Sequence, residues 1–243
     1  KDYVLTVWFV KYLSDIWQDH HQQYQKQYPE HPELMAEMLK NERFQLPDKA
    51  HFSDLYQQRH QPGNGERIDN ALHAIEAQNP SKLTGVFQHI VFNSNKLGEE
   101  KHKNTILRHL LEAFNHTDLN LGPNSIDNPD IIGQVYETLI KSFAATVGKS
   151  ADEFYTPPEV SALIAELVAP QEQDEICDPA CGSGSLLLKC AEQIKKQHNG
   201  SKKYALYGQE AIASTWALAK MNLFLHHQDN HRIEWGDTIR NPK

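Results

Sequence analysis

Apolar residues in the first half of the chain recur at intervals of three and four residues, the spacing of one face of an α-helix. The opening segment follows this spacing with Val4, Leu5, Trp8, Phe9, Tyr12, Leu13, Ile16 and Trp17. Shorter amphipathic stretches follow at residues 31–40 and 104–115, and turn-rich segments at 60–70 and 78–85 are interpreted as breaks. No strand pattern is clear before residue 125, so this half is predicted to be helical.

Residues 119–130 gather Gly, Pro, Asn and Ser and are the best domain boundary. A helix is predicted over residues 130–148, with an inward face of Ile131, Ile132, Val135, Leu139 and Phe143. A further helix is predicted from Pro157, because Thr156 and Glu159 have the spacing of a capping box. Its buried side is expected to consist of Val160, Leu163, Ile164, Leu167 and Val168.

Strand-like and helix-like segments alternate in the remainder of the chain. Strands are predicted at residues 175–178, 203–210 and 232–237, and helices at 185–197 and 212–226. Strands separated by helices of this length form a parallel sheet with crossover helices. The predicted fold is therefore a helical N-terminal domain (residues 1–125) followed by a doubly wound, Rossmann-like α/β domain (residues 126–243) that is incomplete at its C-terminus.

Composition narrows the class of protein. No apolar run approaches the ~18 residues that a membrane span needs, so a membrane protein is not expected. The cysteines Cys177, Cys181 and Cys190 are odd in number and close together, which favours a reducing, cytoplasmic setting. The first residue is Lys and no signal-peptide pattern follows it, so the start is expected to be truncated. A net charge of −8 counts against autonomous DNA binding.

The three predicted strands end in Asp178, Glu210 and Asp237. Ligands of parallel α/β sheets bind beyond the carboxyl ends of the strands, so these acids are expected to converge on one crevice. A Gly-Ser-Gly turn follows Asp178, but Gly184 lacks the lysine that a P-loop requires after it. The dinucleotide fingerprint requires a third glycine where this chain has Leu187.

An acid before the glycines suits a ligand with a cationic end, and Glu210 is placed to accept hydrogen bonds from ribose hydroxyls. A nucleoside with a positive tail and no phosphate meets both conditions. S-adenosylmethionine is such a molecule, and we predict it as the cofactor.

The segment DPACGSGSLL (residues 178–187), with EFYTPPEV (153–160), YGQE (207–210) and GDT (236–238), resembles the N6-adenine DNA methyltransferases. The order of these segments behind a helical amino-terminal domain resembles, more narrowly, the modification (M) subunit of type I restriction–modification systems. Residues 4–17 are similar to that family's first helix. The resemblance implies a site-specific DNA methyltransferase that transfers a methyl group from S-adenosylmethionine to a flipped adenine.

The resemblance also implies residue roles. The methionine end of the cofactor would be lined by Glu153, Phe154, Tyr155, Thr156, Pro157, Pro158, Asp178, Gly182, Ser183, Gly184 and Ser185. Glu210 would hold the ribose, and Asp237 would lie near the adenine ring beside Ile212. Asp237 remains open to a second interpretation, as a cap of the turn after its strand.

The partners that the family implies are double-stranded DNA, a specificity (S) subunit and a restriction (R) subunit, in a hetero-oligomer with two M subunits. The S subunit would recognise the DNA sequence. The family's catalytic Asn/Asp-Pro-Pro-aromatic tetrapeptide is not found, because Asn241-Pro242 lacks the second proline and the aromatic residue. The catalytic residues are therefore unknown, and the chain is expected to be a fragment.

Two other functions stay open at this point. The chain could be an assembly subunit that binds S-adenosylmethionine without catalysis of its own, or a nicotinamide-dependent oxidoreductase, which the missing third glycine disfavours. A metal site is not predicted. Cys177 and Cys181 lack further ligands at zinc spacing and are expected to be buried thiols, and His226, His227 and His231 are expected to be solvated.

Replacement of Glu210 by alanine is expected to weaken the affinity for S-adenosylmethionine by about 1–3 kcal/mol, because it removes a charged hydrogen-bond acceptor. Isothermal titration calorimetry of the wild-type and Glu210→Ala proteins measures the difference. Equal affinities would remove Glu210 from the site.

Overall fold

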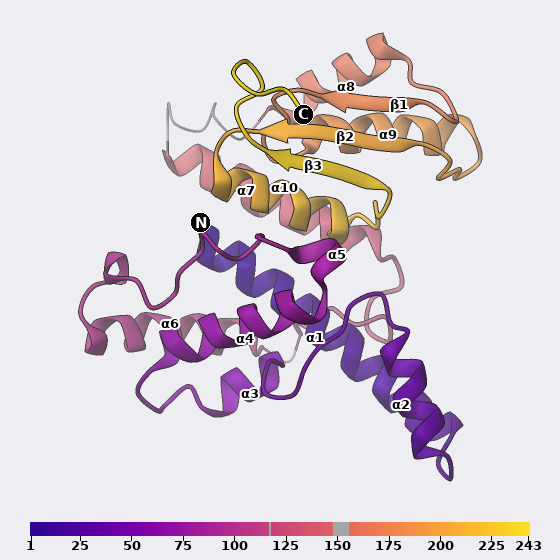
Figure 1. Cartoon of the computed structure of the whole chain (residues 1–243). Coiled ribbons are helices and arrows are strands. Elements are labelled where there is room, and N and C mark those ends of the chain that lie inside the picture. The colour runs from indigo at the N-terminus through magenta and orange to yellow at the C-terminus, as the bar shows by residue number, and fades with distance from the viewer. Residues whose placement is uncertain (117, 148–155) are drawn as a thin grey trace. The chain divides into compact units, whose positions relative to one another are not determined.

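The computed structural model describes residues 1–116, 118–147 and 156–243, and these form two compact units (Figure 1). One unit comprises Asp2–Pro129, and the other comprises Asp130–Lys243 together with Lys1. The first is helical and the second combines helices with a parallel sheet, which confirms the predicted fold class. The functional domain limits at residues 125 and 126 remain a prediction.

The first unit is built around its opening helix. Its elements in chain order are α1 (Asp2–Gln27), α2 (Pro32–Lys40), α3 (Phe52–Gln57), α4 (Asn64–Gln78), α5 (Pro80–Leu83), the 3-10 turn η1 (Asn95–Leu97) and α6 (Glu100–Phe114). Helix α1 packs against α2, α3 and α6. It buries Leu5, Trp8, Phe9, Tyr12 and Leu13, as its apolar spacing predicted.

Two of the predicted breaks contain helices. Helix α4 begins inside the segment 60–70, where Gly63 adopts a φ of 83° as the N-cap and the Asn64 amide donates to Asn104 Oδ1 over 2.9 Å. The short α5 lies inside the segment 78–85 and begins at Pro80, since proline is tolerated at the first helical position. The glycines and prolines in these segments therefore mark where helices start.

Two buried or half-buried aspartates of α1 hold the segment that leads out of this unit. Asp15 accepts a hydrogen bond from the Leu121 amide over 2.8 Å, and Asp19 accepts one from the Asn124 amide over 2.9 Å. A side chain at Gly122 would collide with the Asp19 carboxylate. The segment predicted as a boundary is thus anchored to α1 by hydrogen bonds from its backbone amides to aspartate side chains.

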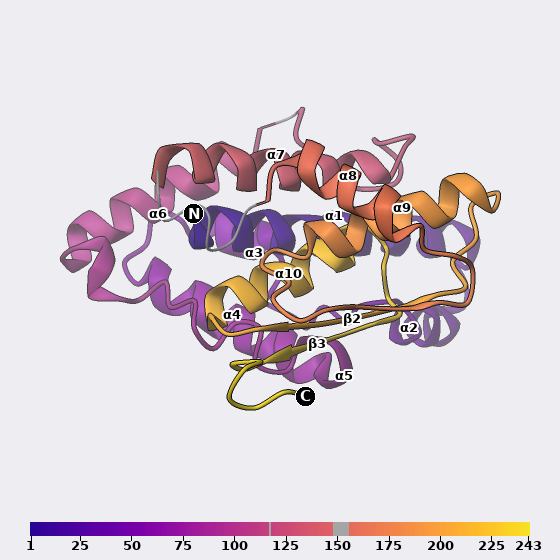
Figure 2. The same cartoon turned by 90° about the horizontal axis from the view of Figure 1, so that it is seen from above.

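The second unit contains α7 (Asp130–Val147), α8 (Pro158–Val168), β1 (Glu175–Asp178), α9 (Ser185–Gln197), β2 (Ala205–Glu210), α10 (Ala213–Leu225) and β3 (His231–Trp235). The strands form a parallel sheet in the order β1-β2-β3. Seen edge-on in Figure 2, α8, α9 and α10 lie on the same side of these strands. This is the arrangement of one half of a doubly wound sheet.

The inward faces of α7 and α8 differ from the prediction. Among the described side chains of α7, Ile132 is buried as predicted, together with Tyr136, Ile140 and Ala144. Ile131 is exposed, and the other predicted residues, Val135, Leu139 and Phe143, are half-buried. In α8 the buried residues are Ser161 and Ala165, while Val160, Leu163, Leu167 and Val168 are exposed. Helix α8 packs on α9, and its buried positions hold small residues.

The start of α8 also differs from the prediction. Its N-cap is Pro157 and the helix begins at Pro158, with no side-chain hydrogen bond at the cap. Thr156 precedes the cap, so the predicted capping box is wrong. The rigid φ of two consecutive prolines determines the helix start here.

The histidine and cysteine predictions need correction as well. His226 is buried, with 6% of its surface exposed, because its ring packs against Gly133 of α7. A Cβ atom at position 133 would lie 2.5 Å from His226 Nε2, so the glycine allows α7 and α10 to approach closely. Burial lowers the pKa of His226 to about 4. Of the cysteines, Cys181 is buried but Cys177 is exposed.

Within the described ranges, none of the helices combines the length and the apolar character that crossing a membrane requires. The same residues contain no group of three or more His, Cys, Asp or Glu side chains arranged to hold a metal ion.

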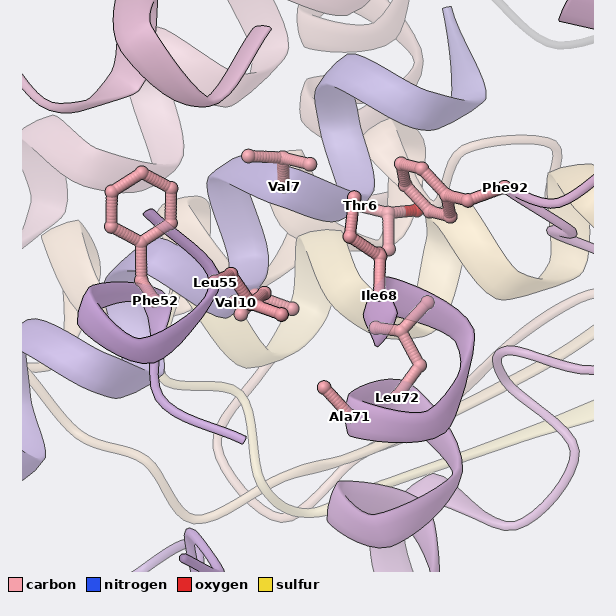
Figure 3. A pocket seen from close by; sticks show the side chains of 9 residues that line it. All are labelled: Thr6, Val7, Val10, Phe52, Leu55, Ile68, Ala71, Leu72 and Phe92. Atoms are coloured by element: carbon pink, nitrogen blue, oxygen red, sulfur yellow. The ribbon is translucent and has the colours of Figure 1, made fainter. Parts of the chain in front are cut away.

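A small apolar cavity of about 10 Å³ lies inside the helical unit, between α1, α3 and α4 (Figure 3). Eight of its nine lining residues are apolar, and the ninth is Thr6. The Thr6 side chain is fully buried, and its hydroxyl has no hydrogen-bond partner among the described residues. A buried water needs about 10–15 Å³ and two to four polar partners, so this cavity is expected to be dry.

Thr6→Val is therefore expected to raise the free energy of unfolding by about 1 kcal/mol, because it replaces an unpaired buried hydroxyl with a methyl group of similar size. Urea unfolding measures the change. The control is Thr105→Val, at an exposed helical position whose hydroxyl donates to the Lys101 carbonyl, and there no gain is expected. A loss of stability in Thr6→Val would mean that the hydroxyl has a partner, such as a trapped water.

Candidate functional site

Asp178 and Glu210 end β1 and β2, whereas Asp237 lies two residues past the end of β3, which is shorter than predicted, and the three acids are staggered along the carboxyl edge of the sheet. Asp178 of β1 pairs with Gly208, two residues before the end of β2, and Glu210 of β2 pairs with Trp235 of β3. Each successive acid therefore lies about two residues farther along the strand direction. A side chain from β2 must reach back to contact the loop that follows β1, and Glu210 does so.

Glu210 holds the glycine loop with its carboxylate. It is buried, with 7% of its surface exposed, and Oε2 accepts the Gly182 amide over 3.0 Å while Oε1 accepts the Ile212 amide over 2.8 Å. One side chain thus connects the loop after β1 with the loop after β2. Each carboxylate oxygen has a second lone pair, so Glu210 retains acceptor capacity for a ligand.

Further hydrogen bonds hold the loop after β1 at Cys181, Ser183 and Gly184. The Cys181 amide donates to the Gln209 carbonyl over 3.0 Å, and the Gly184 amide donates to the Cys181 carbonyl over 2.8 Å. The Ser183 carbonyl accepts a hydrogen bond from Asn222 Nδ2 of α10 over 3.0 Å. The loop is therefore held by contacts with β2 and α10.

Both glycines of the loop are required by the backbone. Gly182 has a φ of 55° and Gly184 a φ of 79°, which is the left-handed region that favours glycine. Gly184 is also the N-cap of α9, so the turn leads directly into that helix. The first amides of a helix have no intrahelical partner and carry partial positive charge, which favours an anionic ligand group there.

Asp178 lies at the start of the same loop. Its Oδ1 accepts the Ala180 amide over 3.0 Å, and no cationic side chain of the described ranges pairs with it. Burial raises the pKa of Asp178 above its usual range, and the Ala180 hydrogen bond opposes that rise. A partly buried carboxylate without a cation beside it suits a ligand that carries a positive charge.

In the structure Asp237 caps the turn after β3, which is the second interpretation that the sequence left open. Its Oδ1 accepts the amides of Ile239 and Arg240 over 2.9 and 3.2 Å, so it caps the turn after β3. A role beside an adenine ring remains a prediction. Ile212 and Trp235 are both partly exposed at these strand ends, and Trp235 Nε1 donates to the Ala211 carbonyl over 3.1 Å.

Three other residues predicted to bind the cofactor line a pocket of the second unit. Thr156, Pro158 and Ser185 line a cavity of about 190 Å³ together with Glu137 of α7 and Lys189 of α9. Burial raises the pKa of Glu137, whose carboxylate lies 4.0 Å from Lys189 Nζ. Pro157 is exposed at the start of α8. Glu153, Phe154 and Tyr155 lie outside the described residues.

The serines of the loop are turned inward. Ser183 and Ser185 are buried, and their hydroxyl oxygens lie 3.1 Å apart. Any contact of Ser183 with a ligand would therefore come from its backbone. The Gly182 amide already donates to Glu210, so it is not free to bind a ligand in the way that the amides at the start of α9 are.

Sequence reasoning missed Asn222, which is fully buried and whose amide group orients the loop. The signal was present, since Asn222 is a polar residue within the otherwise apolar run MNLFL. It also missed Glu137, which the sequence does not distinguish from a solvated acid on an amphipathic helix.

Two protein-family models match the chain in succession. The HsdM N-terminal domain matches residues 1–114, and N-6 DNA Methylase matches residues 127–243. The type I restriction enzyme MjaVIII methylase subunit of Methanocaldococcus jannaschii is 33% identical over 99% of this chain, and the chain spans 40% of that relative. The MpnII methylase subunit of Mycoplasma pneumoniae is 33% identical over 71% of this chain and 32% of the relative.

A solved structure supports the same relationship. The type I restriction-modification system methyltransferase subunit from Streptococcus thermophilus superposes with a TM-score of 0.76 and 25% identity, over 99% of this chain and 54% of that one. A chain from a structural study of the complex assembly of a type I R-M system shares the fold, with a TM-score of 0.59 and 17% identity, over 99% of this chain and 46% of that chain. The chain thus spans about half or less of the relatives it matches.

Replacement of Asn222 by aspartate is expected to destabilise the protein by about 2–4 kcal/mol at pH 8, because two acceptors then face each other in a buried position. The protonated acid can still donate to the Ser183 carbonyl, and burial disfavours the charged form. Both effects raise the pKa of the new carboxyl in the folded state. The deficit is then smallest below the ordinary aspartate pKa and grows as pH rises through the folded value. Chemical unfolding from pH 4 to pH 8 measures it.

The matched control is Asn230→Asp. Asn230 makes the same kind of bond, from Nδ2 to the Tyr204 carbonyl over 2.6 Å, but it is exposed. Its loss is expected to be under about 1 kcal/mol and nearly independent of pH. If both variants lose the same free energy of unfolding, the hydrogen bond from Asn222 to the loop contributes no more than an exposed one.

Proposed function

Because the chain belongs to the family of type I restriction–modification methylase subunits, we propose that its second unit is the cofactor-binding half of a DNA adenine-N6 methyltransferase. Family membership rests on the two matched domains in the order HsdM N-terminal domain, then N-6 DNA Methylase. The cofactor, the substrate and the reaction are the proposal. They apply to the whole protein, because the matched relatives are longer than this chain.

The observation that carries the proposal is the glycine loop between two carboxylates, Asp178 and Glu210. The loop meets the N-terminus of α9, where free amides favour the carboxylate of an amino acid. Asp178 is partly buried and has no cationic partner among the described residues, so it suits the ammonium group of the same amino acid. The remaining lone pairs of Glu210 suit ribose hydroxyls. These groups fit S-adenosylmethionine, which would supply an activated methyl group.

The contribution of these residues to the reaction is positioning. Gln209, Glu210 and Asn222 hold the loop by hydrogen bonds, and an ordered loop loses less conformational entropy when a ligand binds. A methyl donor held in one orientation raises the rate of an in-line transfer to a bound amine. The target adenine would be flipped out of the duplex to reach it.

The proposed partners follow from the family. We propose that the protein acts with a specificity subunit, a restriction subunit and a second M subunit on double-stranded DNA. The solved chain with the same fold comes from a study of complex assembly in a type I R-M system. Partners that supply cationic surface would also explain how a chain with a net charge of −8 acts on DNA.

A second function of the same site is an assembly subunit that binds S-adenosylmethionine without catalysing its transfer. The two are distinguished by methyl transfer from labelled cofactor to duplex DNA, measured with and without a co-expressed specificity subunit. Label in the DNA supports the methyltransferase. Cofactor binding without any label in the DNA supports the assembly function.

Calorimetry tests the cofactor itself. Titration with S-adenosylmethionine and, separately, with NAD should show binding of the first and a much weaker interaction with the second. Tighter binding of NAD than of S-adenosylmethionine would overturn the proposed function, and so would the absence of binding of either compound.

Asp178→Asn is expected to weaken S-adenosylmethionine binding by about 1.5–3 kcal/mol, because asparagine is isosteric but cannot pair with an ammonium group. Since burial disfavours the Asp178 charge, the free energy of unfolding should stay equal or rise slightly. The two quantities therefore separate a ligand role from a structural one.

The pH dependence provides a second readout. Wild-type affinity should be highest above the raised pKa of Asp178 and should fall as pH decreases through it, because the protonated acid cannot pair with ammonium. The fall should begin above the usual aspartate range near pH 4 and should be absent in Asp178→Asn. Parallel profiles for the two proteins would contradict the assignment of Asp178.

A further inference from the structure

A pocket of about 500 Å³ lies in the helical unit, between the turn that joins α3 to α4 and the exposed side of α6. Three cationic side chains line it: Arg59 from the turn, and Lys101 and Arg108 from α6. This concentration of positive charge stands out in a chain whose net charge is −8.

Arg59 is held in one orientation. Its Nη1 donates to the Tyr56 carbonyl over 2.9 Å, and its guanidinium carbon lies 3.8 Å from the centre of the Tyr56 ring. Its Nε lies 3.5 Å from Glu112 Oε1. The side chain is 20% exposed, so the guanidinium is fixed by neighbours while part of it faces the pocket. A guanidinium that is already ordered loses less entropy when it binds an anion.

The positive charges of the pocket exceed the negative charges that neutralise them. Arg59 and Arg108 share the single carboxylate of Glu112, which lies 3.8 Å from Arg108 Nε. Lys101 has no ion-pair partner among the described residues. Glu100 also lines the pocket, but its carboxylate is occupied by Lys103 Nζ at 3.0 Å and by Asn104 Nδ2 at 2.7 Å. An excess of cationic donors therefore remains.

The two walls of the pocket are joined by hydrogen bonds of Asn64, which is buried, and Asn104, which is half-buried. Asn104 Oδ1 of α6 accepts the Asn64 amide over 2.9 Å, and Asn64 Nδ2 donates to the Arg59 carbonyl over 2.8 Å. Arg67 donates to the carbonyls of Gln58, Gln61 and Pro62 and so holds the turn from within. The turn and α6 are thus held together, with Arg59 fixed at the wall of the pocket.

We propose that this pocket binds a phosphate group. Planar guanidinium forks match phosphate oxygens in pairs, and an ammonium group adds a point charge, so the three side chains suit a tetrahedral anion with more than one charge. Two sources supply that chemistry, the backbone of duplex DNA and a free polyphosphate. Backbone contacts of this kind orient a protein on DNA without reading its sequence.

The test uses the full chain, the double variant Lys101→Gln/Arg108→Gln, and the control Lys26→Gln/Lys40→Gln. The control removes two exposed positive charges from the same unit, at the ends of α1 and α2, outside the pocket. Each protein is titrated with fluorescent duplex DNA at salt concentrations from about 50 to 200 mM, and by calorimetry with inorganic pyrophosphate. Arg59 is left unchanged because it also packs on Tyr56.

The pocket variant is expected to bind duplex DNA at least about 10-fold more weakly than the control, and its dependence on salt should be shallower by about one to two in slope. This result identifies the DNA backbone as the source. Loss of pyrophosphate binding with unchanged DNA binding also supports a phosphate site and identifies a free polyphosphate. If the pocket variant and the control bind both probes equally, the proposal is overturned.

S-adenosylmethionine affinity, measured on the same three proteins, separates this proposal from the proposed function. It should be the same in all three, because none of the changed residues is in the second unit. Absence of cofactor binding in every protein would overturn the proposed function and leave the phosphate result to be judged by itself.

Discussion

The carboxylate of Glu210 is the contact on which the candidate site depends. It accepts the amides of Gly182 and Ile212, so it joins the loop after β1 to the loop after β2. Without that connection Gly182, which has a positive φ, would lose the side chain that holds its amide, and only Gln209 and Asn222 would still tie the loop to β2 and α10. An acid at the end of β2 therefore has a structural task as well as its proposed task toward ribose.

This double task changes how substitutions in the site are interpreted. A lower cofactor affinity in Glu210→Ala would combine a lost ligand contact with a less ordered loop. Asp178 is a clearer probe, because its one backbone hydrogen bond to Ala180 is kept by asparagine while the charge is removed. Asn222 probes the loop structure alone, because it is fully buried and its side chain donates to the Ser183 carbonyl.

Charge has different meanings in the two units. In the second unit, acids at strand ends suit the cationic end of a nucleoside. In the helical unit, Arg59, Lys101 and Arg108 leave an excess of positive charge in one pocket. A net charge of −8 describes neither of them, because electrostatic attraction depends on the groups within about 10 Å and much less on the sum over the chain.

Local sequence determined the elements whose signals are local. The alternation of strands and helices after residue 170 predicted the parallel sheet, the 185–197 helix has the bounds of α9, and the glycines of the loop take the positive φ that a tight turn requires. The family resemblance rests on the same short segments. Tertiary structure decided which side of a helix is covered and which distant groups pair. Leu163 and Leu167 are exposed, while the buried positions of α8 are Ser161 and Ala165. His226 is buried because Gly133 leaves room for its ring, and Asn222 holds the loop because its amide reaches the Ser183 carbonyl. Periodicity shows that a helix has an apolar side, but only packing partners that are distant in the sequence determine which side is buried.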